Sequence, residues 1–307
     1  MARCFVTRQL PGSALDRLRA THEVEVWGER LPPGYDELRR HATPADGLLS
    51  MLTDRVDAEL IHGSPRLRAI SNYAVGYDNI DLEAATARGI PVGNTPDVLT
   101  DATADLAFAL LLAAARKLAD AAASVQAGDW LTWEPGRYLG YDVHGATLGI
   151  VGLGRIGQAV AKRAEGFEMK LLHTGAGGAT TLEDLLERSD FVSLHCPLTP
   201  ATHHLIDAAA LGRMRTSAIL INTARGPIVD QPALALALHD GVIAGAALDV
   251  TDPEPLRAGD PLLQAPNLIV VPHIGSATHT AREQMAELAV DNLLAALDGR
   301  PMPHQVG

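Results

Sequence analysis

The stretch that decides the fold is TLGIVGLGRIGQAVAKRAEGFEMKLLHTGAGG, residues 147–178. An apolar run that predicts a β-strand leads into three glycines with the spacing G-x-G-x-x-G, and a helical pattern follows them. The first glycine permits a tight turn, the second lets the backbone approach a pyrophosphate, and the third lets the helix pack closely on the strand. A helix N-terminus also offers free N–H groups and partial positive charge. The stretch therefore predicts a dinucleotide-binding turn made of Gly152, Leu153, Gly154, Arg155, Ile156 and Gly157.

The second half of the stretch lacks a residue that such a turn usually leads to. In NAD-binding units an Asp or Glu about 20 residues further on binds the ribose 2′-hydroxyl. Here the predicted strand ends at His173 and Thr174, and the glycine-rich loop 175–178 follows. Without a carboxylate a 2′-phosphate meets no repulsion, but no Arg follows to hold it. The local candidates are Thr174, His173 and the backbone N–H groups of the loop, so the stretch favours tolerance of NADP over strict selection of NAD.

Length and composition limit the classes of protein that this chain can represent. A chain of 307 residues favours two domains, and a formal net charge of −12 argues against nucleic acid and anionic membranes as partners. The longest apolar run, 106–115, is about half of the roughly 20 residues that span a bilayer. Cys4 and Cys196 are far apart and have no metal-like spacing, which fits a reducing cytoplasm. We expect a cytoplasmic protein without a metal site.

Short apolar strands alternate with helical segments in two series. The first series predicts strands at 2–7, 22–27, 47–52, from 67 onward and at 90–96; the second predicts them at 147–151, 169–173, 190–195, 218–222, 244–249 and 268–271. This alternation indicates parallel sheets flanked by helices. We therefore predict an α/β protein with two Rossmann-like or flavodoxin-like domains and an active-site cleft between them. The last helix, 279–297, should return to the first domain, which gives domains at 1–98 plus 283–307 and at 99–282.

Between the two series lies a segment of different amino-acid composition, residues 101–127. It carries no Gly or Pro and is rich in Ala and Leu, which predicts one long helix with Thr100 or Asp101 as its N-cap. It is apolar around much of its circumference, so we expect it to be buried between domains or subunits. A loop with Trp130 and Trp133 follows.

Three later segments each lie at the C-terminal end of a predicted strand of the second series: INTARGPIVD (221–230), ALDVTDPEPL (247–256) and VPHIGSAT (271–278). Together with the glycine turn they resemble the D-isomer-specific 2-hydroxyacid dehydrogenases, over nearly the whole chain. The stretches NTPDVLTDATADLAFALLLAAAR and GDWLTWEP are most similar to the glyoxylate/hydroxypyruvate reductase branch of that family. The resemblance implies reduction of a small 2-oxoacid, glyoxylate or hydroxypyruvate, with hydride from NAD(P)H, and we favour NADPH over NADH. The catalytic residues that it implies are Arg225, Glu254 and His273.

The chemistry explains why those residue types are needed. A 2-oxoacid presents a carboxylate beside a ketone, and the planar fork of Arg225 can hold both and stabilise negative charge on the oxygen. His273 as imidazolium would donate a proton to the ketone oxygen, and histidine is the side chain best suited to act as a reversible acid and base near neutral pH. Glu254 would favour the charged imidazole and fix its orientation.

The resemblance also implies further site residues. The backbone N–H groups of Val75 and Gly76 would hold the substrate carboxylate, and Trp133 would reach across a homodimer into the partner's substrate pocket or pack in the dimer core with Trp130. Asp249 would contact the nicotinamide carboxamide, and Cys196 would be an apolar wall without a redox role. The remaining residues predicted to line the cofactor groove, together with Arg225 and His273, are Thr103, Pro197, Thr202, Thr223, Ala224 and Gly275.

Other functions stay open at this point. Phosphoglycerate dehydrogenase is one alternative, although its regulatory C-terminal extensions have no counterpart after the last predicted helix. Formate-oxidising or phosphite-oxidising relatives share the fold and the His/Arg core. A nicotinamide-sensing binding protein, like the corepressors of this family, belongs to a different class and retains the same three catalytic-type residues.

Overall fold

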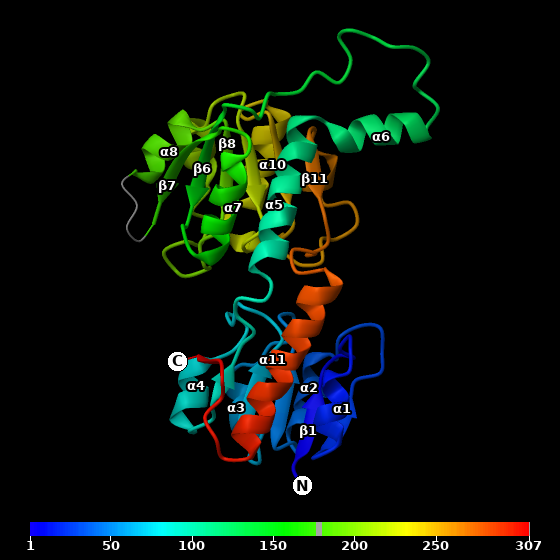
Figure 1. Ribbon diagram of the computed structural model, residues 1–307, viewed down its shortest axis with the longest axis vertical. Helices are drawn as coiled ribbons and strands as arrows, with labels where there is room; N and C mark the ends of the chain where they lie inside the picture. Colours follow the sequence, from blue (N-terminus) through cyan, green and yellow to red (C-terminus); the bar gives the residue numbers. More distant parts are fainter. Residues whose placement is uncertain (176–179, 307) are drawn as a thin grey trace. The chain divides into compact units, whose positions relative to one another are not determined.

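The computed structural model describes residues 1–175 and 180–306, and it divides into two compact units. The first unit comprises Met1–Leu99 and Ala277–Gly307, and the second comprises Thr100–Ser276. Within the described residues each unit contains a six-stranded sheet with helices packed against it (Figure 1). The predicted α/β fold with two largely parallel sheets is confirmed. The predicted boundary at 282/283 lies inside helix α11 (His279–Leu297), whereas the structure divides the chain before this helix and keeps it whole.

The first unit has the strand order β12-β5-β4-β3-β1-β2. All neighbouring strands are parallel except β12, which is antiparallel to β5. Alternate residues face opposite sides of this sheet: Gly47 lies against Leu293 and Leu297 of α11, while Leu48 belongs to the apolar cluster with α2, α3 and α4. The elements are β1 (Arg3–Val6), α1 (Ala14–Arg19), β2 (Glu23–Val26), α2 (Tyr35–Ala42), β3 (Gly47–Ser50), α3 (Ala58–Gly63), β4 (Ala69–Asn72), α4 (Leu82–Ala87), β5 (Val92–Gly93), α11 and β12 (Gln305–Val306).

Strand β12 was not predicted from the sequence. It is two residues long and follows a proline-rich stretch that has no strand periodicity. Its pairing with Val92 and Gly93 depends on contacts made only in the folded chain, including a hydrogen bond from the Asn94 N–H to the His304 carbonyl.

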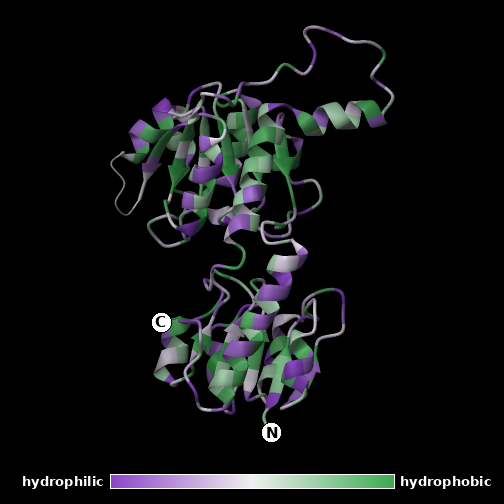
Figure 2. Ribbon diagram, viewed as in Figure 1, coloured by the Kyte–Doolittle hydropathy of each residue, from purple (hydrophilic) through white to green (hydrophobic). Residues whose placement is uncertain are grey.

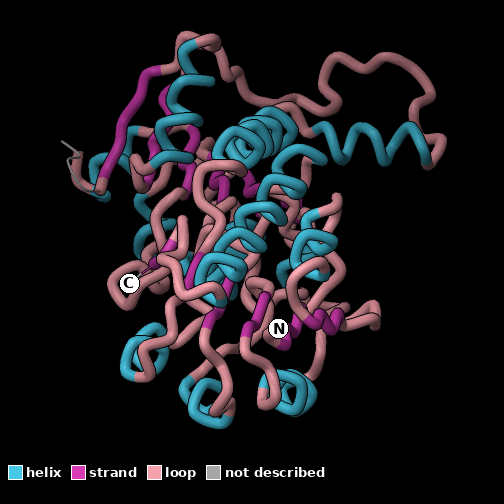
Figure 3. The backbone as a smooth tube through the Cα atoms, turned by 60° about the horizontal axis from the view of Figure 1, so that its bottom comes forward, coloured by secondary structure: helices cyan, strands magenta, loops and turns pink. Residues whose placement is uncertain are grey.

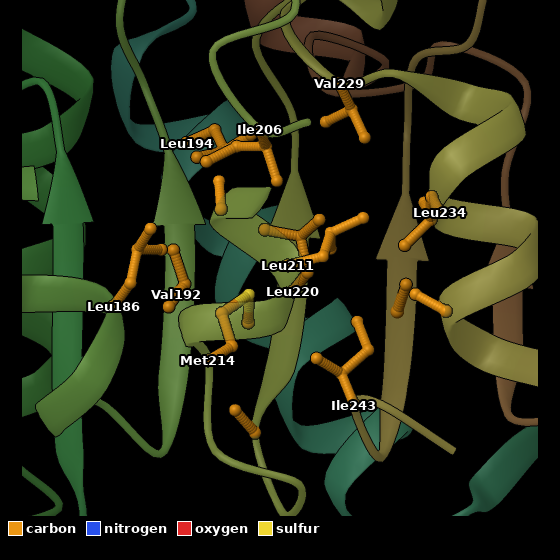
Figure 4. Close-up of a cluster of buried hydrophobic side chains, with 14 of the residues drawn as sticks. Leu186, Val192, Leu194, Ile206, Leu211, Met214, Leu220, Val229, Leu234 and Ile243 are labelled. Atoms are coloured by element: carbon orange, nitrogen blue, oxygen red, sulfur yellow. The ribbon is translucent and has the colours of Figure 1, made fainter. Parts of the chain in front are cut away.

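The second unit has the strand order β11-β10-β9-β8-β6-β7, and every neighbouring pair is parallel. Ile219 and Ile221 face the cluster with α5 and α7, whereas Leu220 faces the opposite cluster with Met214 and Ile243 (Figure 4). The elements are α5 (Thr100–Ala115), α6 (Leu118–Gln126), β6 (Thr147–Val151), α7 (Arg155–Glu165), β7 (Lys170–Thr174), α8 (Leu182–Arg188), β8 (Phe191–Leu194), α9 (Ala208–Arg213), β9 (Ile219–Asn222), α10 (Gln231–His239), β10 (Gly245–Leu248) and β11 (Leu268–Val270), with 3₁₀ turns η1 (Gly226–Ile228) and η2 (Pro261–Gln264).

The prediction of one continuous helix over 101–127 is wrong, because the structure has two helices, α5 and α6. Lys117 between them is left-handed, with φ of 50°, and the N–H of Tyr141 donates to the Ala115 carbonyl that would otherwise continue the helix. A Cβ at Gly140 would overlap that same carbonyl oxygen. The break thus comes from a distant segment that closes the end of α5, and the local sequence carries no Gly or Pro to signal it.

The two helices also differ in burial. The sheet-facing side of α5 is buried, while α6 and the first part of the loop after it extend away from the sheet of their unit (Figures 2 and 3). The end of this loop returns to the unit, where Val143 is buried in the cluster with α5. Within the single chain α5 is buried against the sheet of its own unit. The predicted burial of the segment between domains or subunits stays a prediction. No helix among the described residues has both the length and the apolar character needed to cross a membrane.

Candidate active site

The carboxyl ends of the second unit's strands carry nearly all the predicted site residues of that unit. Because all six strands are parallel, these ends lie at one edge of the sheet. Following the strand order from β11 to β7 (Figure 1), the edge presents His273, Asp249, the Thr223–Arg225 segment, Cys196, the glycine turn and Thr174. The sheet topology therefore assembles residues that are far apart in the sequence.

The glycine turn combines close backbone packing with an open helix start. Gly152 has φ of 94°, and a Cβ there would lie 2.6 Å from the backbone nitrogen of Cys196. A Cβ at Gly157 would overlap the Gly152 carbonyl oxygen, so two of the glycines are required by close backbone approach. Gly154, in contrast, faces open space and is the N-cap of α7, and no described side chain caps this helix start. An uncapped helix start beside open space suits an anionic ligand. Leu153 and Ile156 of the turn are half-buried against the α5 side of the core.

The end of β7 lies directly beside this turn. The N–H of Gly152 donates to the Thr174 carbonyl at 3.0 Å, and β7 pairs with β6 along its length. Residues 170–175 contain no carboxylate, as the sequence shows. The Nδ1 atom of His173 is buried and has no hydrogen-bond partner among the described residues. Residues 176–178, most of the loop predicted to offer backbone N–H groups, lie outside the described residues.

The imidazole of His273 is paired with Glu254. Nδ1 of His273 lies 2.9 Å from Oε2 of Glu254, and both side chains are about one-quarter exposed, at 26% and 27%. The other carboxylate oxygen, Oε1, accepts the N–H of Thr251 at 3.0 Å. The backbone thus fixes the carboxylate, and the carboxylate in turn orients the ring with Nδ1 occupied. This leaves Nε2 as the ring atom for exchanging a proton with a substrate.

Asp249 shapes the turn that carries His273. The aspartate is 2% exposed, its carboxylate accepts the N–H groups of Ile274 (2.6 Å) and Gly275 (2.8 Å), and its carbonyl accepts that of His273 (2.9 Å). Burial raises the pKa of Asp249, although these hydrogen bonds and the nearby His273 oppose the shift. A Cβ at Gly275 would lie 3.0 Å from the Asp249 carboxylate and 3.4 Å from Thr103. This backbone-holding role of Asp249 was missed by the sequence analysis.

The loop that carries Arg225 is held by a second residue that sequence reasoning missed, Asn222. Its Oδ1 accepts the N–H of Ala224 at 3.0 Å, and its Nδ2 donates to the Arg225 carbonyl at 2.9 Å. An Asn that bonds the backbone two residues on is a known turn signal, so the Asn at the start of NTARG could have revealed this role. A Cβ at Gly226 would overlap the Thr251 carbonyl oxygen, so this loop packs directly on the loop that leads to Glu254.

Three predicted groove residues differ in what their side chains do. The hydroxyl of Thr223 is buried and has no partner among the described residues, so it is available to a ligand. Burial raises the pKa of the Cys196 thiol, which keeps it neutral. The hydroxyl of Thr202 instead closes its own loop, donating to the Pro197 carbonyl at 2.6 Å and accepting the N–H of Thr199.

Three predicted substrate residues, Val75, Gly76 and Trp133, lie outside this sheet edge. Val75 and Gly76 are half-buried and follow β4 in the first unit. Trp133 lies in the loop 127–146 of the second unit and is 80% exposed. In the described parts of the chain, no group of three or more His, Cys, Asp or Glu side chains is arranged to hold a metal ion.

Comparison with known proteins places this site in a family. Residues 108–275 match the family described as D-isomer specific 2-hydroxyacid dehydrogenase, NAD binding domain. The glyoxylate reductase of Korarchaeum cryptofilum is 48% identical, over 99% of this chain and 95% of the relative. The glyoxylate reductase of Pyrococcus horikoshii is 49% identical, over 97% of this chain and 94% of the relative.

Solved structures agree with these relatives. A crystal structure of a protein from Thermus thermophilus has a TM-score of 0.93 and 52% identity, and covers 99% of this chain and 100% of that one. The NADPH-dependent glyoxylate/hydroxypyruvate reductase of Sinorhizobium meliloti has a TM-score of 0.86 and 33% identity, over 100% of this chain and 98% of that one. The fold and the site therefore define an oxidoreductase that uses a nicotinamide dinucleotide. The chain belongs to the D-isomer specific 2-hydroxyacid dehydrogenase family.

Proposed function

We propose that this protein reduces glyoxylate or hydroxypyruvate to the corresponding 2-hydroxyacid with a reduced nicotinamide cofactor. The observation that carries the proposal is the His273–Glu254 pair at 2.9 Å, located at the sheet edge beside the Arg225 loop. Such a pair supplies a proton donor and acceptor with a fixed direction, and the neighbouring loop carries Arg225, a cation of the type that can hold a carboxylate. The relatives named as glyoxylate reductases support this choice of substrate.

In the proposed mechanism each residue has a distinct role. Arg225 binds the substrate carboxylate and the ketone oxygen through its guanidinium fork, and stabilises the charge that develops on that oxygen. Nε2 of His273 donates a proton to the oxygen, while Glu254 keeps Nδ1 in place. The backbone N–H groups of Val75 and Gly76 bind the carboxylate. The bound cofactor supplies the hydride, and the glycine turn, Thr223 and Asp249 are the residues proposed to hold it.

The proposed preference for NADPH has two supports. Residues 170–175 offer no carboxylate to repel a 2′-phosphate at the end of β7, and the related Sinorhizobium meliloti enzyme is NADPH-dependent. The test is a steady-state panel that crosses NADH and NADPH with glyoxylate, hydroxypyruvate, pyruvate and 3-phosphohydroxypyruvate. We expect the highest kcat/KM with NADPH and either of the first two acids. No oxidation of either cofactor with any of these acids would reject the proposal in favour of a binding protein.

We also propose that the protein is a homodimer in which Trp133 reaches the partner's substrate pocket. The support is a run of exposed apolar side chains on α6 and the loop after it, of the kind that marks an interface. These are Leu118, Val125, Trp130, Leu131, Trp133 and Leu139, each more than half exposed. Sedimentation at micromolar concentration tests the proposal, and a monomer there would contradict it.

A further inference from the structure

The loop that contains Val75 and Gly76 is held in an unusual way. Both residues follow β4, and neither backbone N–H donates to another described residue. A loop whose N–H groups bind a ligand has to be fixed through other atoms, since those groups must stay available. The carbonyl oxygens of the same two residues are the atoms that the first unit holds.

Two buried asparagine side chains hold these carbonyls. Nδ2 of Asn94 donates to the Val75 carbonyl at 2.8 Å, and Nδ2 of Asn72 donates to the Gly76 carbonyl at 2.9 Å. Asn72 has no exposed surface and Asn94 is 7% exposed. Asn72 also donates to Oδ1 of Asn79 at 3.0 Å, so its own amide is fixed in turn.

A third asparagine connects this arrangement to α11. Asn292 is fully buried, its Nδ2 donates to the Asn94 carbonyl at 2.9 Å, and its Oδ1 accepts the N–H of His304 at 3.0 Å. A Cβ at Gly93 would lie 2.6 Å from Nδ2 of Asn292, so only glycine leaves room for this bond. Hydrogen bonds therefore run from α11 through β5 to the loop.

We propose that Asn72 and Asn94 are positioning residues for binding of the substrate carboxylate. By holding both carbonyls they keep the two N–H groups of the loop directed at one ligand, which lowers the cost of ordering the loop when substrate binds. An amide is required, because each carbonyl needs an N–H donor and an ionised carboxylate offers none. This proposal rests on the proposed function, since it takes Val75 and Gly76 as the carboxylate-binding residues.

The test compares Asn94→Ala and Asn72→Ala with a matched control, Ser64→Ala. Ser64 is also buried in the first unit, and its hydroxyl donates to the Leu60 carbonyl at 2.8 Å, away from the loop. We expect either asparagine variant to raise KM for glyoxylate about fivefold to tenfold, in line with the loss of one hydrogen bond, with kcat within about threefold of wild type. Ser64→Ala should leave KM unchanged, although it should lower Tm by about as much as the asparagine variants do. Asn94→Asp, which keeps the shape but removes the donor, replaces Asn94→Ala if the latter does not fold.

A second readout does not depend on activity. Amide hydrogen exchange of the peptide that covers residues 74–78 should accelerate in the asparagine variants and not in Ser64→Ala. An unchanged KM in folded asparagine variants, or unchanged exchange of this peptide, would overturn the proposal. Absence of 2-oxoacid reduction by the wild-type protein would instead reject the proposed function, and the exchange experiment would still decide whether the asparagines hold the loop.

Discussion

The backbone N–H of His273 donates to the carbonyl oxygen of Asp249 at 2.9 Å, and the carboxylate of the same aspartate accepts the next two N–H groups along the chain. His273 has φ of 52°, a left-handed conformation that a residue with a Cβ adopts only when its surroundings hold it there. Asp249 thus determines where the imidazole of His273 lies, and it does so through the backbone.

Replacing Asp249 by Ala should therefore misplace His273. We expect kcat/KM for glyoxylate to fall roughly 100-fold, or about 2.7 kcal/mol, together with a loss of thermal stability. The matched control is Asp207→Ala, which removes a carboxylate that accepts the N–H of Ala210 at 2.8 Å at the start of α9. The control should lose stability and keep its kinetics; equal kinetic loss in both variants would contradict the role of Asp249.

The two members of the acid/base pair should differ in their response to mutation. His273→Gln removes the proton donor, so kcat with glyoxylate should fall by about 10² to 10⁴. Glu254→Gln leaves an amide oxygen that can still accept from Nδ1, so its loss should be smaller. Steady-state kinetics at saturating cofactor measure both, and near-normal kcat in His273→Gln would exclude the proposed proton transfer.

Arg225→Ala should impair substrate binding far more than cofactor binding. Loss of a charge-assisted, bidentate contact predicts an increase in KM for glyoxylate of roughly 30-fold or more. The dissociation constant for NADPH, measured by fluorescence titration without substrate, should change by less than about threefold. This change is smaller than the effect expected from losing one neutral hydrogen bond. A parallel loss of both would show that Arg225 acts on the cofactor site instead.

Two glycines of the same turn should respond differently to alanine. Gly154→Ala adds a methyl group into open space where the pyrophosphate is expected, so stability should hold while the dissociation constant for the cofactor rises about tenfold or more. Gly157→Ala forces a Cβ onto the Gly152 carbonyl and should lower Tm strongly. Calorimetry and cofactor titration separate the two effects, and unchanged cofactor affinity in Gly154→Ala would argue against this location for the pyrophosphate.

Acid should destabilise the protein partly through His195. Desolvation lowers the pKa of His195 to about 4, and its Nε2 lies 2.8 Å from the Ser193 hydroxyl. In the unfolded chain the imidazole takes up a proton below about pH 6.5, whereas the folded state resists protonation down to about pH 4. The free energy of unfolding should therefore fall between these pH values, by at most about 1.4 kcal/mol per pH unit from this group. Urea denaturation of wild type and His195→Gln at several pH values measures it; an identical pH dependence in both would refute the assignment.

Local patterns were sufficient to predict most of the elements and the strand-end residues. The short apolar runs and the G-x-G-x-x-G spacing are local properties, and they predicted every strand of the two sheets except β12, the start of α7, and the range of α11 at residues 279–297. The local sequence contained no signal for features that depend on long-range contacts. The break at Lys117 depends on Tyr141, and strand β12 depends on pairing with β5.

The candidate site divides in the same way. The sequence by itself identified Arg225, Glu254 and His273 as candidate catalytic residues, because each lies in a short motif that resembles a motif of the family. Only the tertiary structure decided that Glu254 faces Nδ1 of His273, that Asp249 holds the turn of His273, and that Asn72 and Asn94 hold the loop after β4. These relationships join residues from different strands and loops, and their geometry exists only once the sheets have formed and the buried polar groups have found their partners.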